Sequence, residues 1–139
     1  MSIIPAFSKF SITKDLLLLI NANVELIGLV GENIYPIVAP EKDSNGNDIN
    51  ECIIYYREKL IPQYVQNTVV SSDLKITYVV ISKNYSTSIT MAELLNDTIE
   101  GLHQNSDGYN YRCRLVDSDE NVTGQKSDIY MQILTFEIK

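Results

Sequence analysis

Residues that commonly carry catalysis or bind metal are scarce in this sequence. The chain of 139 residues has one histidine, His103, and two cysteines, Cys52 and Cys113. A metal site of the cysteine and histidine type needs three or four ligands, so these residues cannot form one. Both cysteines fall inside apolar runs, which predicts buried thiols and argues against a reactive Cys–His pair. His103 is expected at the C-terminal end of a helix, where a cation is favourable for the helix dipole.

Catalytic and nucleotide-binding motifs are missing as well. The sequence has no G-x-S-x-G motif, no glycine-rich phosphate loop and no H-E-x-x-H motif, and its 6 glycines are spread out. Nothing singles out a pair of carboxylates as a general acid and base. We therefore expect a protein that is not an enzyme and that needs no cofactor.

Positive charge and long apolar runs are also limited. The formal net charge of −7 disfavours binding to nucleic acid, and the closest basic pairs, Arg57/Lys59 and Arg112/Arg114, do not form a patch. The apolar run Leu16–Ile20 is far shorter than the roughly 20 residues that span a bilayer. The start of the chain lacks the pattern of a signal peptide. These features predict a soluble protein of a bacterial cytoplasm, with no membrane partner.

One acidic stretch has the spacing of a calcium loop. Asp117, Asp119, Asn121 and Asp128 occupy the first, third, fifth and twelfth positions of such a loop. However, Val122 stands where the turn requires glycine, and the twelfth position lacks the longer glutamate. A solvated acidic loop over residues 118–127 is the preferred interpretation, and calcium binding is a weak alternative.

Hydrophobic periodicity predicts one α+β domain over residues 12–139, preceded by an N-terminal arm, residues 1–11. Helices are expected at 12–22 and 88–103, the second capped by Thr90 and Glu93, with a short helical turn at 24–29. Strands are expected at 33–38, 52–57, 74–83, 109–117 and 128–138, with Pro36 on a sheet edge and an interruption at Pro62. The order α-β-β-β-α-β-β favours a mainly antiparallel sheet with two helices packed on one face.

The strands are apolar on both faces, whereas two helices can cover only one. Ile53 and Tyr55 alternate with Ile54 and Tyr56, for example, and the last strand shows the same pattern. The second face therefore needs a cover, which the arm or a neighbouring subunit could supply. Candidate interface segments are the 41–51 loop, the 60–72 stretch and the arm, with the candidate residues Asn45, Asn47, Ile49, Ile3, Ile4 and Phe7.

Several short motifs, in this order and at this spacing, resemble the tail-completion family of siphophages and prophages, also called tail terminator or head–tail joining proteins. They follow the leading helix and are Leu29–Gly31 with Ile34–Pro36, then Ala39–Pro40, Ile53–Tyr55, the strand 76–81 running into a helix at 85–102, and Phe136 in the last strand. The sequence has Asn50–Glu51 where the family usually places a proline. The resemblance covers residues 12–138.

The resemblance implies a ring-forming subunit, often a hexamer, that caps the tail tube and meets the head connector, without catalysis. It would be made in the cytoplasm of the bacterial host and then belong to the virion tail. Two other classes of protein stay open. One is a monomeric prophage accessory module that docks a protein partner through the 41–51 loop. The other is a small hydrolase or transferase, which would show a deep pocket with titratable groups of perturbed pKa.

Overall fold

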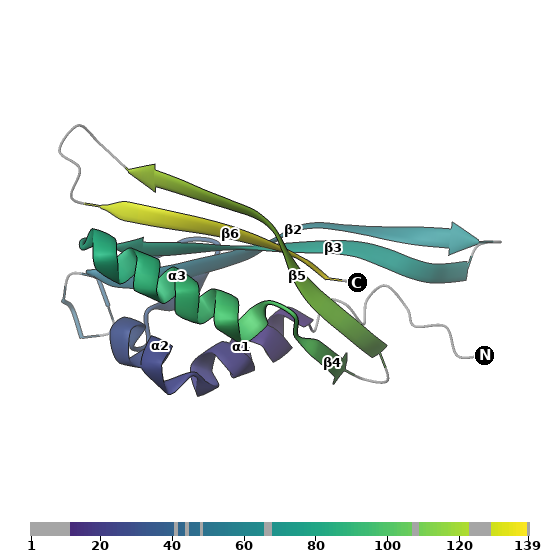
Figure 1. The fold of residues 1–139 in the computed structure, drawn as a ribbon, viewed down its shortest axis with the longest axis horizontal. Coiled ribbons are helices and arrows are strands. Elements are labelled where there is room, and N and C mark those ends of the chain that lie inside the picture. The colour runs from purple at the N-terminus through teal and green to yellow at the C-terminus, as the bar shows by residue number, and fades with distance from the viewer. Residues whose placement is uncertain are drawn as a thin grey trace.

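The computed structural model describes residues 12–40, 42–43, 45–47, 49–65, 68–106, 109–122 and 129–138, with side chains outside 58–73, 103–110 and 121–128. Six strands form one sheet in the order β1-β2-β3-β6-β5-β4. β1 pairs with β2 in parallel, and every other pair is antiparallel. The three helices lie together on one face of this sheet (Figure 1). The predicted α+β architecture is confirmed.

The first two helices follow the predicted pattern. α1 spans Ile12–Ala22, and its residues Ile12, Leu16 and Ile20, one turn apart, are buried. The short turn expected after it is a separate helix, α2, which spans Val24–Val30. The Asn23 side chain accepts a hydrogen bond from the Leu26 amide, and Gly31 ends the helix with a φ of 63°.

The third helix, α3, spans Tyr85–Ile99, so it begins and ends earlier than the predicted 88–103. Its N-cap is Asn84, whose side chain accepts from the Thr87 amide at 3.0 Å, and the predicted cap at Thr90 is wrong. The helix ends before Gly101, which has a φ of 75°. His103 therefore begins strand β4, His103–Ser106, and its predicted place at a helix terminus is also wrong.

The central strands are longer than the sequence indicated. β2 spans Glu51–Val65 and β3 spans Thr68–Ser82. β2 continues through Pro62, which pairs with Ser72, so the predicted interruption is wrong. In the described residues, β2 has no partner other than β3 at this point, and a proline without an amide hydrogen is tolerated on such an edge. β1, Ile34–Pro36, forms a sheet edge as its proline predicted.

The C-terminal strands complete the sheet. β5 spans Tyr109–Val122 and β6 spans Tyr130–Ile138. The predicted boundary after Asp117 is wrong, because β5 continues to Val122 where a polar loop was expected. A register shift between Leu115 and Asp117 marks a bulge, and the acidic residues beyond it pair with β6.

The core lies between the helices and the sheet. In β3, Leu74, Ile76, Tyr78 and Val80 are buried on this face, as the alternation of the strand predicted. The ring of Tyr78 meets that of Phe136 edge to face, with the centroids 5.9 Å apart and an interplanar angle of 74°. The core packs the helices against β3 and β6, the central strands of the sheet. It therefore fixes the position of the outer strands relative to the helices.

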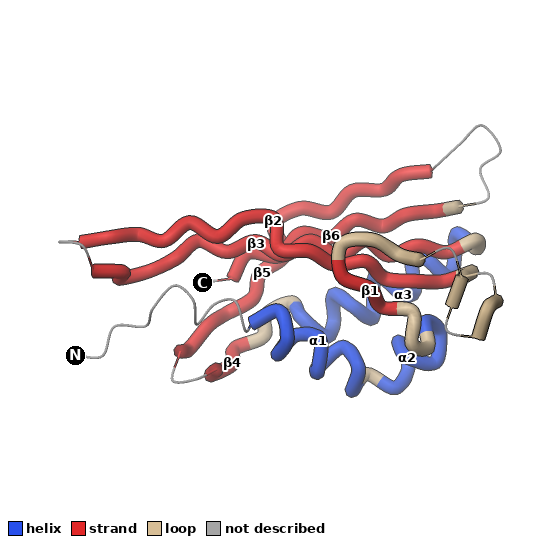
Figure 2. Tube along the Cα trace, turned by 180° about the vertical axis from the view of Figure 1, so that it is seen from behind, coloured by secondary structure: helices blue, strands red, loops and turns tan. Residues whose placement is uncertain are grey.

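The opposite face of the sheet, which we call the outer face, is also apolar. Ile54, Val79 and Ile133 lie in register across β2, β3 and β6, and all three are partly exposed. Beside them the hydroxyl oxygens of Thr77 and Thr135 lie 3.1 Å apart. Figures 1 and 2 show no described helix over this face. The expected two-sided sheet is confirmed, whereas the arm with Ile3, Ile4 and Phe7 lies outside the described residues.

Ile37 has an unfavourable backbone conformation. Its φ is 68°, and the Val38 amide donates to the Pro36 carbonyl across it at 2.7 Å, which makes a strained γ-turn. The side chain is 76% exposed, so little packing is lost on its removal. We expect Ile37→Gly to raise the free energy of unfolding by up to about 1 kcal/mol, because glycine adopts this conformation without strain. Urea unfolding measures the change, and a loss of stability would contradict it.

Candidate protein interface

A two-stranded ribbon extends beyond the rest of the sheet. Its residues, Leu60–Val65 of β2 and Thr68–Leu74 of β3, pair with one another, and of these only Leu74, at the root of the ribbon, also pairs with β6. β1 pairs only as far as Tyr55, and β6 ends its pairing with β3 at Leu74. Figure 1 shows the ribbon passing the end of the helical layer. A two-stranded hairpin without a packing layer is marginally stable in water, so this ribbon is a candidate contact arm.

The ribbon coincides with the 60–72 stretch that was predicted as an interface segment. Its sequence is rich in apolar residues, among them Leu60, Ile61, Tyr64, Val69 and Val70. The outer face begins next to it, where Tyr56 of β2 is 38% exposed. By its backbone position and its composition, the ribbon is therefore a candidate interface segment next to the outer face.

The 41–51 loop contains the turn that Asn45 and Gly46 predicted. The amides of Asn45 and Asn47 both donate to one carboxylate oxygen of Asp43 at 2.9 Å, and Gly46 has a φ of 81°. Asn45 and Asn47 are exposed, and Ile49 is partly buried. The side chains of these two asparagines are therefore available to a partner, while Ile49 contributes less.

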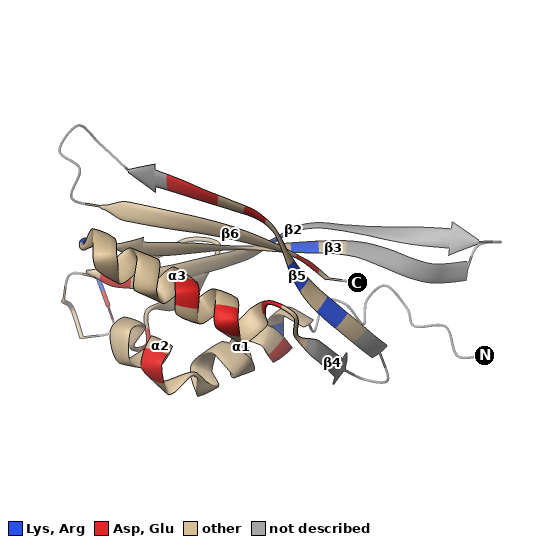
Figure 3. Cartoon of the chain, in the orientation of Figure 1, with Lys and Arg blue, Asp and Glu red and all other residues tan. Residues whose placement is uncertain are grey.

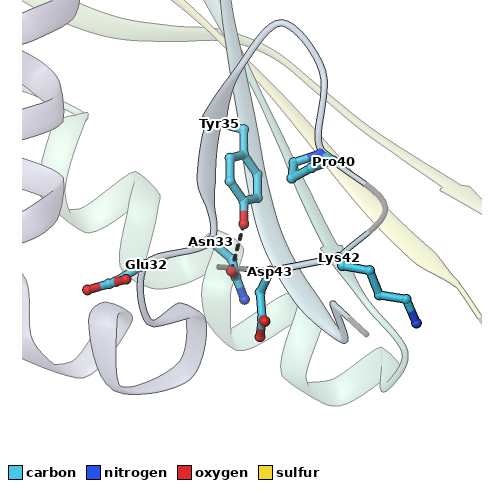
Figure 4. Close-up of a pocket in the computed structure, with 6 residues that line it drawn as sticks. All are labelled: Glu32, Asn33, Tyr35, Pro40, Lys42 and Asp43. Atoms are coloured by element: carbon cyan, nitrogen blue, oxygen red, sulfur yellow. Dashed lines mark hydrogen bonds between the residues drawn. The ribbon is translucent and has the colours of Figure 1, made fainter. Parts of the chain in front are cut away.

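A shallow pocket of about 290 Å³ opens between this loop and β1 (Figure 4). The Tyr35 hydroxyl donates to the Asn33 side chain at 2.8 Å, and Pro40 lies beside the ring. Figure 4 shows the charged ends of Glu32 and Lys42 pointing away from one another. The Tyr35 hydroxyl, Asn33 and Asp43 lie near one another in this pocket, and nothing in the described residues assigns a ligand to it.

The two thiols are buried, as predicted. Cys52 is 4% exposed and Cys113 is 1% exposed, and both are free. Burial, with a smaller effect of Glu51, raises the pKa of Cys52 to about 11. Burial, with a smaller effect of Glu100, raises the pKa of Cys113 to about 12. Neither thiol has the electropositive, accessible surroundings of a nucleophile.

Thiol reactivity tests this assignment. A pKa raised from 9.0 to about 11 lowers the thiolate fraction at neutral pH by roughly a hundredfold. We expect both cysteines to react with a disulfide reagent at least that much more slowly in the native protein than in urea. If one of them reacted at the unfolded rate, that thiol would be accessible and the assignment would be wrong.

The calcium-like residues do not form a loop. Asp117 and Asp119 are exposed on β5, opposite Thr135 and Ile133, and Asn121 continues the same strand. Asp117 and Asp119 therefore lie on one face of an extended strand and not in a helix-flanked calcium loop. Asp128 lies outside the described residues. The predicted solvated loop is therefore wrong for residues 118–122, which belong to β5, and calcium binding stays a weak prediction.

Two further observations limit the kinds of site in the described part of the chain. No group of three or more histidine, cysteine, aspartate or glutamate residues is placed there to hold a metal ion. None of its helices is long and apolar enough to cross a bilayer.

The sequence did not reveal how charge is distributed along the sheet edges. Asp117 was predicted to end a strand and Asp119 to lie in a polar loop, whereas both belong to β5. Without that strand assignment, the position of these carboxylates on a sheet edge could not be inferred.

Comparison with solved structures finds chains of similar fold. The sequence matches no protein-family model and no curated protein. The fold is similar to a chain in the virion of a native gene transfer agent particle, with a TM-score of 0.70 and 15% sequence identity. The alignment covers 88% of this chain and 89% of that chain, so the two share the whole fold.

Proposed function

We propose that this chain is a structural subunit of a phage-like particle, and specifically a tail-completion subunit of the tail terminator or head–tail joining kind. It would assemble into a ring, as a hexamer, that caps the tail tube and joins it to the head connector. The observation that carries this proposal is the similarity in fold, over nearly the whole chain, to a chain of a gene transfer agent virion. The order of the short motifs from Leu29 to Phe136 supports the tail-completion role.

The surfaces of the molecule support a role in assembly. The ribbon extends beyond the helical layer, and the outer face carries the partly exposed apolar residues Ile54, Val79 and Ile133. Apolar area of this kind is commonly buried against another subunit. We propose that the ribbon and the outer face contact neighbouring copies or the tail tube.

The described chemistry supports a role without catalysis. Both thiols are buried and have raised pKa values. Assembly would take place in the cytoplasm of the bacterial host, after which the subunit would belong to the virion tail. Its partners would be copies of itself, the tail tube and the head connector.

Deletion of the gene in a particle-producing strain tests the proposal. We expect separate heads and tails by electron microscopy, and joined particles when the intact gene is supplied again. In purified particles, antibody labelling is expected at the head–tail junction. Joined particles that form normally without the chain would overturn the proposal. A chain absent from particles and bound as a monomer to another protein through the 41–51 loop would instead support the accessory-module alternative.

A further inference from the structure

At each edge of the sheet, a short strand pairs with only part of the longer strand beside it. β1 pairs with β2 at Ile53–Tyr55, and β4 pairs with β5 at Tyr109–Arg112. Within the described residues, β2 beyond Tyr55 pairs only with β3, and β5 beyond Leu115 pairs only with β6. The chain therefore presents two open half-edges on opposite sides of one sheet, and open edges are potential contact sites.

The half-edge on β5 is strongly acidic. Asp117, Asp119 and Glu120 are exposed, and the segment Leu115–Val122 contains no lysine or arginine. The helix α3, which contacts β5 and β6, adds exposed Glu93 and Asp97 one turn apart and has no basic residue. Figure 3 shows acidic residues along α3 and the far part of β5. We call these five residues the acidic flank.

The half-edge on β2 has the opposite sign. Arg57 is exposed on β2 just beyond the end of the β1 pairing, and Lys59 follows in the same strand. Lys59 lies opposite the exposed Lys75 of β3, which has Glu137 of β6 on its other side, and Glu58 is the only acidic residue of Tyr56–Val65. We call Arg57, Lys59 and Lys75 the basic flank.

Opposite charges on opposite edges favour a head-to-tail arrangement. If two copies met through the same edge, like charges would face one another, which costs energy and disfavours a two-fold dimer. Contact between unlike edges is heterologous, and such contacts close into a ring when the rotation between copies permits it. This charge distribution is thus the kind that a ring-forming subunit requires.

We propose that the acidic flank of one copy contacts the basic flank of the next copy. The inference rests on the proposed function, since it names the contact that would build the ring. Side chains rather than a continuous backbone ladder would make this contact. The Glu120 amide already donates to the Asp119 carboxylate at 2.8 Å, and Pro62 of β2 has no amide hydrogen. Exposed charge pairs are individually weak, so the contact should depend on several of them and weaken with salt.

Zero-length cross-linking tests the contact directly. A carbodiimide joins carboxylates to lysine amines, and an equal mixture of ¹⁴N- and ¹⁵N-labelled full-length chains distinguishes links between copies from links within one. We expect mixed-isotope links from Asp117, Asp119 or Glu120 to Lys59 or Lys75 at low salt, and fewer at high salt. Mixed-isotope links confined to other carboxylates and lysines overturn the inference. Links from these carboxylates to Lys9 of the same copy, which would place the arm on the edge, also overturn it.

Charge reversal provides a second, independent test. The variant D117K/D119K/E120K gives the acidic flank a net positive charge, so that both flanks are basic. The variant R57E/K75E gives the basic flank a net negative charge, so that both flanks are acidic. Each alone should lose at least tenfold in association by sedimentation velocity at low salt, and an equal mixture of the two should regain it. Glu25→Lys changes an exposed charge on α2, outside both flanks, and serves as the control. Association that the flank variants leave unchanged, or that their mixture does not restore, overturns the inference.

The experiments distinguish a wrong edge contact from a wrong proposed function. If particles contain the chain at the head–tail junction but the flank variants assemble normally, the edge contact is wrong and the proposed function stands. If the flanks link as expected but particles lack the chain, the edge contact stands and the proposed function is wrong.

Discussion

Replacement of Phe136 by alanine is expected to lower the free energy of unfolding by about 4 kcal/mol. The side chain is 0% exposed, on the core face of β6, and its ring meets Tyr78 edge to face at 5.9 Å. Neighbouring core positions, including Ile76 opposite it on β3, are also fully buried. The truncation would therefore leave a cavity between the sheet and the helices that well-packed neighbours can fill only in part.

Urea unfolding followed by circular dichroism measures this loss. Tyr78→Phe is the matched control in the same aromatic pair, because it keeps the ring and removes only the hydroxyl. That hydroxyl is buried and has no hydrogen-bond partner among the described residues, so its removal should cost nothing or stabilise slightly. A small effect of Phe136→Ala, below about 1 kcal/mol, would show that the helices and sheet do not pack around this ring.

The parts of the fold that sequence predicted best are those where burial alone sets the pattern. α1 has one apolar stripe, Ile12, Leu16 and Ile20, and its bounds were predicted correctly. The faces of β3 were assigned correctly because its side chains alternate between two layers. In both cases the period of the apolar residues matches the geometry of the element.

The errors arise where a local polar group or a distant partner decides the outcome. Asn84 caps α3 through its side chain, whereas Ser88 is buried and donates to the Tyr85 carbonyl. Asparagine, serine and threonine are all favourable N-caps, so residue type alone does not rank Asn84 above the predicted Thr90. β5 extends to Val122 because β6 pairs with it, and that pairing is not visible in the composition of the segment.

In the candidate interface, too, some features were predicted from the sequence and others were not. Apolar residues on both faces of the strands predicted a second buried face, and the positions of Ile54 and Val79 confirm that it is apolar. The ribbon was marked only as a stretch of unexplained composition, since Pro62 argued against a continuous strand. The two charged flanks required the register of β2 and β5, which depends on strands distant in sequence.

Shortening the ribbon is expected to abolish incorporation into particles while leaving the domain folded. Replacing residues 61–73 by Asn-Gly would join Leu60 to Leu74, which already lie opposite one another, through a two-residue hairpin turn. The buried residue Leu74 and the rest of the described core are retained. Unfolding free energy should therefore change by no more than about 1 kcal/mol, because the removed pairs form a marginally stable hairpin.

The consequence for assembly should be much larger than for stability. If the ribbon is a contact arm, the shortened chain has lost most of the surface that extends past the helices, and its abundance in purified particles should fall at least tenfold by quantitative mass spectrometry. The double variant N45A/N47A is the matched comparison, because it removes two exposed side chains from the 41–51 loop without touching the ribbon. If the shortened chain is incorporated normally and the N45A/N47A variant is missing from the particles, the contact is made by the 41–51 loop and not by the ribbon. Because a folded but unincorporated chain separates assembly from stability, this pair of variants distinguishes a contact arm from a segment that only supports the sheet.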